Sequence, residues 1–260
     1  MKDMIKNKIE EWISKEYYCS IEVLYGKETI YSINTNTEQP YIKIMAYRNC
    51  IVICTSRDLY TRLRTLLKDK NRDEIFEFPF VYGQTIHYVP SDKYMDTAIF
   101  NNTSATDLSL NNIFLSSDYN CEFLFDEEIF SLRGLKGFDN SLSFDAKGDT
   151  PTKALFIVKD NEKIIGVAGA AKTAVDGVYE IGVDVMEQHR NAGLGSYLVS
   201  RLTQGLLARN IVPFYSASVT NIGSQMVANR CGYMPLWVDT YGTTLDGSSV
   251  YNNIVSELSL

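Results

Sequence analysis

Apolar residues dominate three successive segments in the middle of the chain, at 153–158, 163–171 and 178–186. The turn sequences Asp-Asn-Glu-Lys and Asp176-Gly177 separate these segments, and such sequences are typical of hairpins. The pattern therefore predicts a meander of three antiparallel strands.

The apolar spacing becomes helical after residue 194, where Leu198, Leu202 and Leu206 recur every four residues. Three further elements are expected after this helix, in the order strand, helix, strand: 214–219, 222–231 and 236–241. A meander followed by strands that alternate with helices forms a mixed sheet with helices on both faces. We therefore expect an α/β fold (an α+β mixed sheet) for this half of the chain.

The N-terminal half has shorter elements and predicts a separate, smaller α+β domain. Its expected elements are a helix ending near residue 15, strands at 19–25, 41–46 and 49–54, and a helix at 57–68 with Ser56 as N-cap. The polar segment 101–112 is poor in core-forming residues, so we place the boundary there. The predicted domains are 1–112, of unknown role, and 113–260. A helical segment at 126–135 and a terminal hairpin around Asp246-Gly247 complete the second domain.

Composition narrows the class of protein. The chain has 260 residues, of which 45% are hydrophobic and 22% charged, and a formal net charge of −7. No overall positive field would attract nucleic acid or an anionic membrane, and no stretch is long and apolar enough for a membrane span. Five irregularly spaced cysteines favour reduced thiols and a cytoplasmic location. The basic helix at 57–68 carries no interleaved aromatic residues, so a solvated face is favoured over a nucleic-acid site.

The segment 180–195 joins a strand to a helix through a glycine turn. Gly193 and Gly195 leave no side chain between a ligand and the N–H groups of the first helical turn, whose unpaired donors suit a phosphate. A P-loop is disfavoured because no Lys follows Gly195. A dinucleotide fingerprint is disfavoured because Leu198 stands where its third glycine is required.

The turn sequence Arg-Asn-Ala-Gly-Leu-Gly at 190–195 resembles the R/Q-x-x-G-x-G/A pyrophosphate loop of the GNAT superfamily of acyl-CoA-dependent N-acyltransferases. Residues 212–233 resemble the next strand and helix of that fold. The resemblance covers about 130–242 and is closer to a bacterial subgroup with an additional N-terminal domain. It implies a GNAT acyltransferase fold in the C-terminal half and an N-acetyltransferase that uses acetyl-CoA as co-substrate, with no metal.

The resemblance also implies which residues hold coenzyme A. Those facing the pantetheine are Val183, Asp184 and Val185, through backbone groups. Those whose N–H groups receive the pyrophosphate are Asn191, Ala192, Gly193, Leu194, Gly195 and Ser196. Asn221 and Ser224, at the start of the following helix, lie by the coenzyme A arm. Arg190 either adds charge to the pyrophosphate or braces the loop.

Two residues are candidates for proton transfer. Many family members carry a Tyr or a Glu at positions that are Ala228 and Ser216 here. Glu180 and Asp184 share one face of their strand by period-two spacing, and either carboxylate could act as general base. The alternative for Asp184 is a structural carboxylate that accepts loop N–H bonds. Cys231 is expected to pack at a helix end rather than act as a nucleophile.

The acceptor is expected to meet the loop at 137–145, which mixes aromatic and hydrogen-bonding residues. Phe138, Asn140 and Ser143 are the candidate substrate-binding residues, although folding of the aromatic rings into the core is an equal alternative. The expected acceptor is a small-molecule or peptide primary amine, with no nucleic-acid or membrane partner. The oligomeric state is open, with a homodimer as one option. A non-catalytic acyl-CoA-binding or sensing protein is the alternative function.

Overall fold

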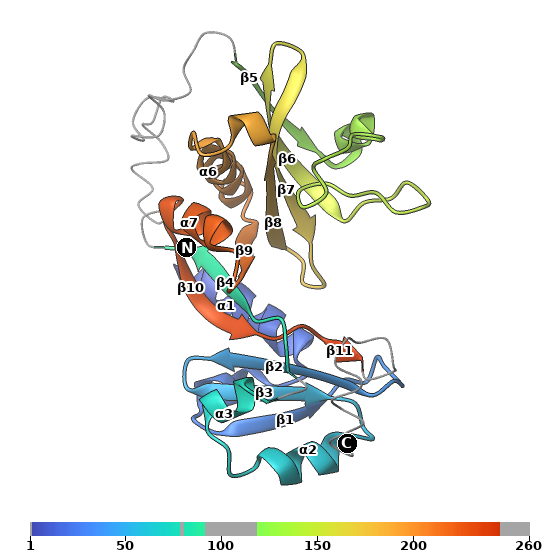
Figure 1. Cartoon of the computed structure of the whole chain (residues 1–260), viewed down its shortest axis with the longest axis vertical. Helices are drawn as coiled ribbons and strands as arrows, with labels where there is room; N and C mark the ends of the chain where they lie inside the picture. Colours follow the sequence, from blue (N-terminus) through green and yellow to red (C-terminus); the bar gives the residue numbers. More distant parts are fainter. Residues whose placement is uncertain (1, 79–80, 92–118, 245–260) are drawn as a thin grey trace. The chain divides into compact units, whose positions relative to one another are not determined.

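The computed structural model describes residues 2–78, 81–91 and 119–244 (Figure 1). The chain divides into two compact units that interleave along the sequence. The first unit consists of Met1–Ile9, Tyr88–Ser216 and Asn221–Met234, and the second of Glu10–His87, Ala217–Thr220 and Pro235–Leu260. Helix α1 (Lys2–Glu16) and strands β4 (Thr85–Pro90), β9 (Val212–Ser218) and β10 (Tyr233–Asp239) contribute residues to both units.

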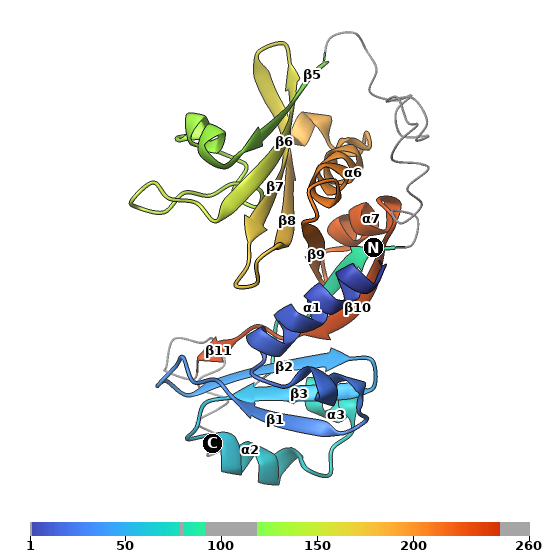
Figure 2. The same cartoon turned by 180° about the vertical axis from the view of Figure 1, so that it is seen from behind.

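The first unit is built on a mixed sheet (Figure 2). Its strands include β5 (Tyr119–Phe125), β6 (Thr152–Asp160), β7 (Lys163–Lys172) and β8 (Val178–Val185), each antiparallel to the next, with β9 parallel to β8. The predicted meander is confirmed as β6, β7 and β8. Strand β5 was not predicted, although Cys121, Phe123 and Phe125 share one of its faces.

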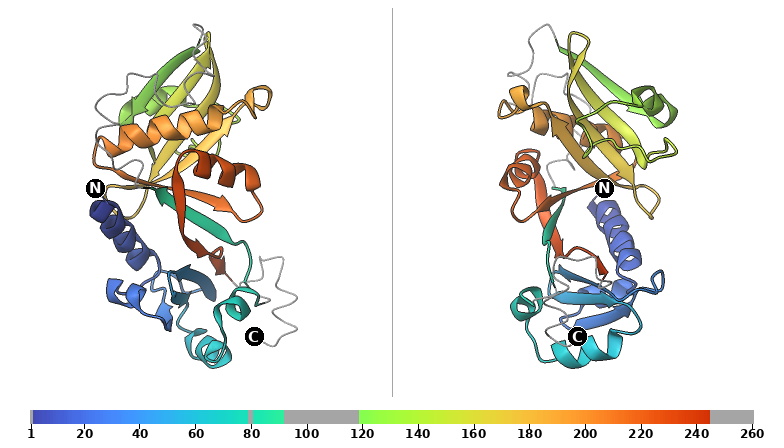
Figure 3. Two further views of the ribbon diagram at one scale, coloured as in Figure 1. Left: turned by 90° about the vertical axis from the view of Figure 1, so that its left-hand side faces the viewer. Right: turned by 45° about the vertical axis from the view of Figure 1, so that its right-hand side comes forward.

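Helices and a long loop cover the two faces of this sheet (Figure 3). Helix α6 (Leu194–Leu207) lies against β6, β7 and β8, and α7 (Ile222–Arg230) contacts α6. On the other face lie the 3₁₀-helix η3 (Asp126–Leu132) and the loop after it. Their shared core contains Leu124, Ile129, Phe138, Leu142, Leu155, Ile157 and Val167. The helix predicted at 126–135 is therefore shorter, because Arg133 leaves helical geometry and Gly134 turns the chain at φ +90°.

The second unit contains a sheet of its own. Strands β1 (Thr29–Ile33) and β3 (Cys50–Thr55) are parallel, and β2 (Tyr41–Tyr47) runs antiparallel to β3. Helices α2 (Tyr60–Leu67) and α3 (Arg72–Phe76) carry Leu63, Leu67, Ile75 and Phe76 into the core with β2 and β3. Strand β10 and the short β11 (Thr243–Thr244) both pair with β2.

Two predictions in the second unit are wrong in detail. The strand expected at 19–25 is instead the 3₁₀-helix η1 (Ile21–Tyr25), in which only Leu24 is buried, so its apolar residues do not form a strand face. The helix expected from residue 57 begins at Tyr60. Ser56 does not cap it, because the Ser56 hydroxyl accepts a hydrogen bond from the Tyr41 N–H (3.0 Å).

The predicted division at residue 112 stays a prediction, because segment 101–112 lies outside the described residues, as does the hairpin expected around Asp246-Gly247. The compact units are not contiguous in sequence. The reason lies in β10, whose residues Trp237 to Asp239 pair with Tyr47 to Met45 of β2. The strand predicted at 236–241 therefore completes the N-terminal sheet.

Candidate functional site

Strands β8 and β9 separate within the first unit. Their parallel pairing runs from Val178 with Val212 to Ile181 with Tyr215, and β8 continues four residues further, to Val185. The backbone of residues 182–185 is thus no longer engaged with β9 in that register. Backbone groups of these residues that point away from β7 are outside that pairing with β9, and an amide-containing chain such as pantetheine could pair with them.

The turn after β8 delivers the N-terminus of α6. Gly193 is the N-cap in left-handed geometry (φ +89°), and the first helical bond runs from Tyr197 N to Gly193 O (3.1 Å). The N–H groups of Leu194, Gly195 and Ser196 precede that bond, so helix geometry gives them no intrahelical acceptor. Together with the positive end of the helix dipole, they fit a pyrophosphate.

Arg190 braces this turn. Its Nε donates a hydrogen bond to the carbonyl of Val185 (3.0 Å), which ties the start of the loop to the end of β8. This is one of the two roles that the sequence left open. Arg190 is exposed to solvent.

The two glycines of the turn differ in whether the fold would accept a side chain at their position. A Cβ built at Gly195 would make ordinary contacts with Val227 (3.6 Å) and Val185 (3.8 Å), so the fold itself accepts a small side chain there. Gly193 has positive φ, where any L side chain is strained. Gly195 therefore allows the ligand site to be changed without straining the turn.

A hydrogen bond between two hydroxyl groups joins the start of α7 to strand β9. Asn221 caps the helix by accepting a hydrogen bond from Ser224 N (3.0 Å), and the Ser224 hydroxyl lies 2.6 Å from the Tyr215 hydroxyl. Tyr215 is the last β9 residue paired with β8, so it stands where the strands separate. Burial raises the pKa of Tyr215, which keeps it a proton donor. Tyr215 was not among the residues predicted from the sequence, which pointed to the positions of Ser216 and Ala228. The Ala228 side chain is fully buried.

The carboxylate of Asp184 holds the loop that follows η3. Its Oδ1 accepts a hydrogen bond from Asn140 Nδ2 (2.6 Å), and its Oδ2 accepts from Ser141 N and Ser141 Oγ (both 2.8 Å). The backbone of these two loop residues lies directly over Gly182 and Gly169. A Cβ at either glycine would come within 1.8 Å of the Asn140 or Ser141 carbonyl oxygen.

The other predicted acceptor and catalytic residues do not all lie at the face of β8 that carries Asp184. Glu180 is exposed and, by strand alternation, shares the face of Gly182 and Asp184. Asn140 lies at this face through its bond to Asp184. Phe138 is 5% exposed and packs in the core, while Ser143 is exposed on the loop.

Cys231 is buried beneath the start of α6. Its thiol donates a hydrogen bond to the Ser196 carbonyl (3.2 Å), and burial raises its pKa to about 11. A thiol held protonated is a poor nucleophile, which agrees with a packing role. Within the described parts of the chain, no group of three or more His, Cys, Asp or Glu side chains could hold a metal ion.

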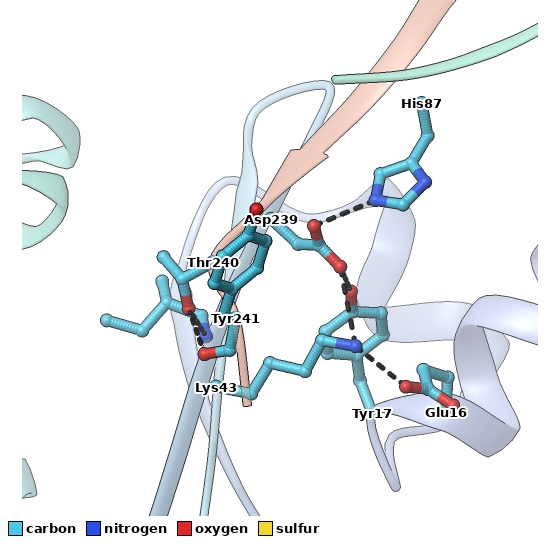
Figure 4. A network of polar contacts seen from close by, with 8 residues as sticks. Glu16, Tyr17, Lys43, His87, Asp239, Thr240 and Tyr241 are labelled. Atoms are coloured by element: carbon cyan, nitrogen blue, oxygen red, sulfur yellow. Dashed lines mark hydrogen bonds and ion pairs between the residues drawn. The ribbon is translucent and has the colours of Figure 1, made fainter. Parts of the chain in front are cut away.

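A second polar cluster lies in the second unit (Figure 4). Asp239, whose side chain is 6% exposed, accepts hydrogen bonds from His87 Nε2 (2.8 Å) and the Tyr17 hydroxyl (2.5 Å), and lies 3.4 Å from Lys43 Nζ. Lys43 also pairs with Glu16 (2.7 Å). Burial alone would raise the pKa of Asp239, but the bond and charge of His87, with Lys43 and Tyr17, hold it below its ordinary value. These groups satisfy one another, so the cluster is structural.

The model of a known protein family covers the part of the chain that contains this turn. Residues 118–233 match the model of the Acetyltransferase (GNAT) family. The GCN5-related N-acetyltransferase-like protein from Streptococcus suis 89/1591 is 14% identical, with 92% of this chain and 99% of that chain covered and a TM-score of 0.46. A GNAT-family acetyltransferase from Colwellia psychrerythraea is 10% identical, with 76% and 64% covered and a TM-score of 0.42. The chain thus spans less than two thirds of the latter protein. No curated protein matches.

Residues 118–233 therefore match an acetyltransferase domain of the GNAT family, and the chain has a mixed α/β fold. Strands β1 to β3 and helices α2 and α3 lie N-terminal to the matched residues. Among the helices described, none is both long and apolar enough to cross a membrane.

Proposed function

We propose that the first unit transfers an acetyl or similar short acyl group from acetyl-CoA to a primary amine by direct attack. The observation that carries this proposal is the left-handed Gly193 turn, which presents the N-terminus of α6 beside the separating strands β8 and β9. A site of this kind suits a pyrophosphate joined to an amide-containing arm. The acceptor is a small molecule or a peptide, and the odd number of cysteines supports a cytoplasmic location.

Binding of acetyl-CoA would use mainly backbone groups. The N–H groups of residues 191–196 receive the pyrophosphate, with Arg190 adding charge beside them. The backbone of 183–185 faces the pantetheine, and Asn221 and Ser224 border it from α7. The backbone supplies this affinity, so conservative side-chain changes there would alter it little.

The chemistry requires three proton transfers, two away from the nitrogen and one to the sulfur. Glu180 takes a proton from the acceptor ammonium, and the freed amine attacks the thioester carbon. As the carbon–sulfur bond breaks, the nitrogen releases a second proton to solvent. The departing thiolate takes a proton from the Tyr215 hydroxyl, which Ser224 orients through the 2.6 Å contact. No covalent intermediate on the protein is needed.

Titration of the protein with acetyl-CoA tests the site. Gly195→Asp places a carboxylate where the pyrophosphate binds, yet an acidic residue in the first helical turn favours the helix itself. We expect the Asp variant to bind acetyl-CoA at least ~100-fold more weakly, which is about 2.7 kcal/mol. Gly195→Ala is the matched control, because its Cβ makes only ordinary contacts. Equal affinity of the wild type and Gly195→Asp would remove the pyrophosphate from this turn.

A non-catalytic acyl-CoA-binding or sensing protein is the competing function, since Ala228 and Ser216 replace residues that act in many relatives. A sensing protein would bind acetyl-CoA at the same site as an acetyltransferase but would not transfer the acyl group to an amine. Release of free thiol upon addition of an amine separates the two functions.

A further inference from the structure

The loop at 137–145 is seated on the sheet by two glycines that face each other. Gly169 of β7 and Gly182 of β8 are paired residues in the antiparallel register. A Cβ at Gly169 would lie 1.8 Å from Ser141 O, and one at Gly182 would lie 1.7 Å from Asn140 O. Real Cβ atoms do not approach a carbonyl so closely, so only glycine permits this contact at both positions.

Asp184 lies two residues beyond Gly182, on the same face of β8. Both of its carboxylate oxygens are occupied by donors from the seated segment: Asn140 Nδ2 on one, and Ser141 N and Oγ on the other. A proton that arrived from an amine at either oxygen would compete with a donor already pointing at it. Ser141 is itself buried. The carbonyl of Phe138 also accepts from Ser141 N (3.1 Å) and shares the single hydroxyl proton of Ser141 (3.0 Å) with Asp184.

We propose that Asp184 is a positioning residue: its carboxylate, with the Gly169–Gly182 seat, fixes the Asn140–Ser141 segment as the wall of the amine site. This inference rests on the proposed acyl transfer. It assigns Asp184 the opposite role to a general base and leaves Glu180 as the carboxylate on that face that meets the amine. Asp184 acts through the loop and therefore affects acceptor binding, not acetyl-CoA binding.

Two substitutions of the same residue separate these roles. In Asp184→Asn the amide oxygen can still accept from Ser141, and the new NH₂ group can donate to Asn140 once the Asn140 amide turns over. All three bonds are then kept, although no basic oxygen remains. In Asp184→Ala all three are lost. A positioning residue therefore predicts a mild Asn variant and a severe Ala variant, whereas a general base predicts that both are severe.

Amide hydrogen exchange tests the positioning without an acceptor. The Ser141 amide should exchange about 10-fold faster in Asp184→Ala than in the wild type, because it loses the shorter of its two acceptors (2.8 Å) and keeps only Phe138 O (3.1 Å). In Asp184→Asn it should exchange at about the wild-type rate. Gly182→Ala should also accelerate exchange, because it displaces Asn140. An unchanged exchange rate in Asp184→Ala would show that Asp184 does not position the Asn140–Ser141 segment, whether or not the protein transfers acyl groups.

Steady-state kinetics test the consequence for the reaction, with acetyl-CoA and whichever of putrescine, tyramine and a hexapeptide N-terminus is acetylated. Asp184→Ala should raise the acceptor KM about 10-fold or more while leaving the affinity for acetyl-CoA unchanged. Asp184→Asn should keep kcat within about 5-fold and keep the pH profile of the wild type. A loss of 100-fold or more in kcat for Asp184→Asn, with normal exchange at Ser141, would make Asp184 the base.

The proposed function and this inference fail in different ways. If none of the three amines is acetylated and acetyl-CoA still binds, the proposed transfer fails. The hydrogen-exchange data alone then decide whether Asp184 positions the Asn140–Ser141 segment. If an amine is acetylated but the exchange rate of Ser141 does not change in Asp184→Ala, the transfer stands and the positioning role of Asp184 is overturned.

Discussion

Asp184 in the first unit and Asp239 in the second each accept hydrogen bonds at both carboxylate oxygens, but from different donors. Asp184 accepts hydrogen bonds from two neutral side chains and one backbone N–H, all from a single loop. Asp239 accepts hydrogen bonds from His87 and Tyr17 and forms an ion pair with Lys43. These three side chains come from separate parts of the chain.

The difference shows how one residue type serves two purposes. Asp239 is buried, so its charge must be balanced within the fold, and removing it leaves Lys43 without its buried counter-charge. Asp184 is only partly buried and orders a surface loop without a charged partner in that network. We therefore expect changes at Asp239 to lower stability and changes at Asp184 to affect the reaction.

The largest effect is expected from Asp239→Asn. It removes the buried charge opposite Lys43, whose side chain is 14% exposed. Breaking a buried pair costs about 3–5 kcal/mol when the other charge is left uncompensated, and since Lys43 keeps Glu16 (2.7 Å) we expect the lower end of that range. Urea unfolding at pH 7 measures this loss. Glu162→Gln, an exposed carboxylate in the turn after β6, is the control and should stay within about 0.5 kcal/mol. A loss below 1 kcal/mol for Asp239→Asn would show that the cluster does not stabilise the fold.

A smaller effect, on rate alone, is expected from Tyr215→Phe. Loss of the hydroxyl bonded to Ser224 should reduce kcat about 10- to 100-fold, because the thiolate loses its proton donor. Affinity for acetyl-CoA should not change. Tyr233→Phe is the matched control, since it removes a similar bond, from Tyr233 to the Thr203 hydroxyl (2.7 Å). Equal kcat in wild type and Tyr215→Phe would remove this residue from the reaction.

Acid should expose the contribution of Asp239. Its folded pKa is held below the ordinary value, so its stabilisation is present above the unfolded pKa of about 3.9 and is lost as pH falls through the folded pKa. Between the folded and unfolded pKa values of Asp239, unfolding of the wild type should therefore take up more protons than unfolding of Asp239→Asn, with a difference of at most one proton. Parallel stability curves for the two proteins at pH 2–5 would contradict this assignment.

The smallest effect is expected from Ser141→Ala. It removes one of the three bonds to Asp184 and keeps the backbone bond from Ser141 N. The loss should be about 1 kcal/mol, and the acceptor KM should rise only a few-fold. An effect as large as that of Asp184→Ala would mean that the hydroxyl, not the backbone N–H, holds the loop.

The strands and helices that carry the site were predictable because their apolar spacing is regular. Strands β6 to β8 and helices α6 and α7 lie close to their predicted ranges, and the Gly193 turn was visible as a glycine between a strand and a helix. The family resemblance and the mixed α/β fold are confirmed. The coenzyme A, catalytic and acceptor assignments stay predictions.

Long-range contacts were not predictable, because spacing along the chain does not encode them. The seat of Asn140 on Gly182 joins residues about forty positions apart, and the Tyr17–Asp239 bond spans most of the chain. Tyr215 was missed because its hydroxyl gains meaning only through Ser224 on another element. Glycines placed opposite each other in adjacent strands, as Gly169 and Gly182 are, are the signal that could have located the loop.

The central claim is acyl transfer at the α6 N-terminus. It is tested most directly by incubating wild type, Gly195→Ala and Gly195→Asp with acetyl-CoA and each primary amine, and measuring the amide product and free thiol by mass spectrometry. We predict equal amounts of amide and thiol with wild type and Gly195→Ala, and at least ~100-fold less of both with Gly195→Asp. Acetyl-CoA that binds to wild type but stays intact with every amine would contradict the claim and favour the acyl-CoA sensor.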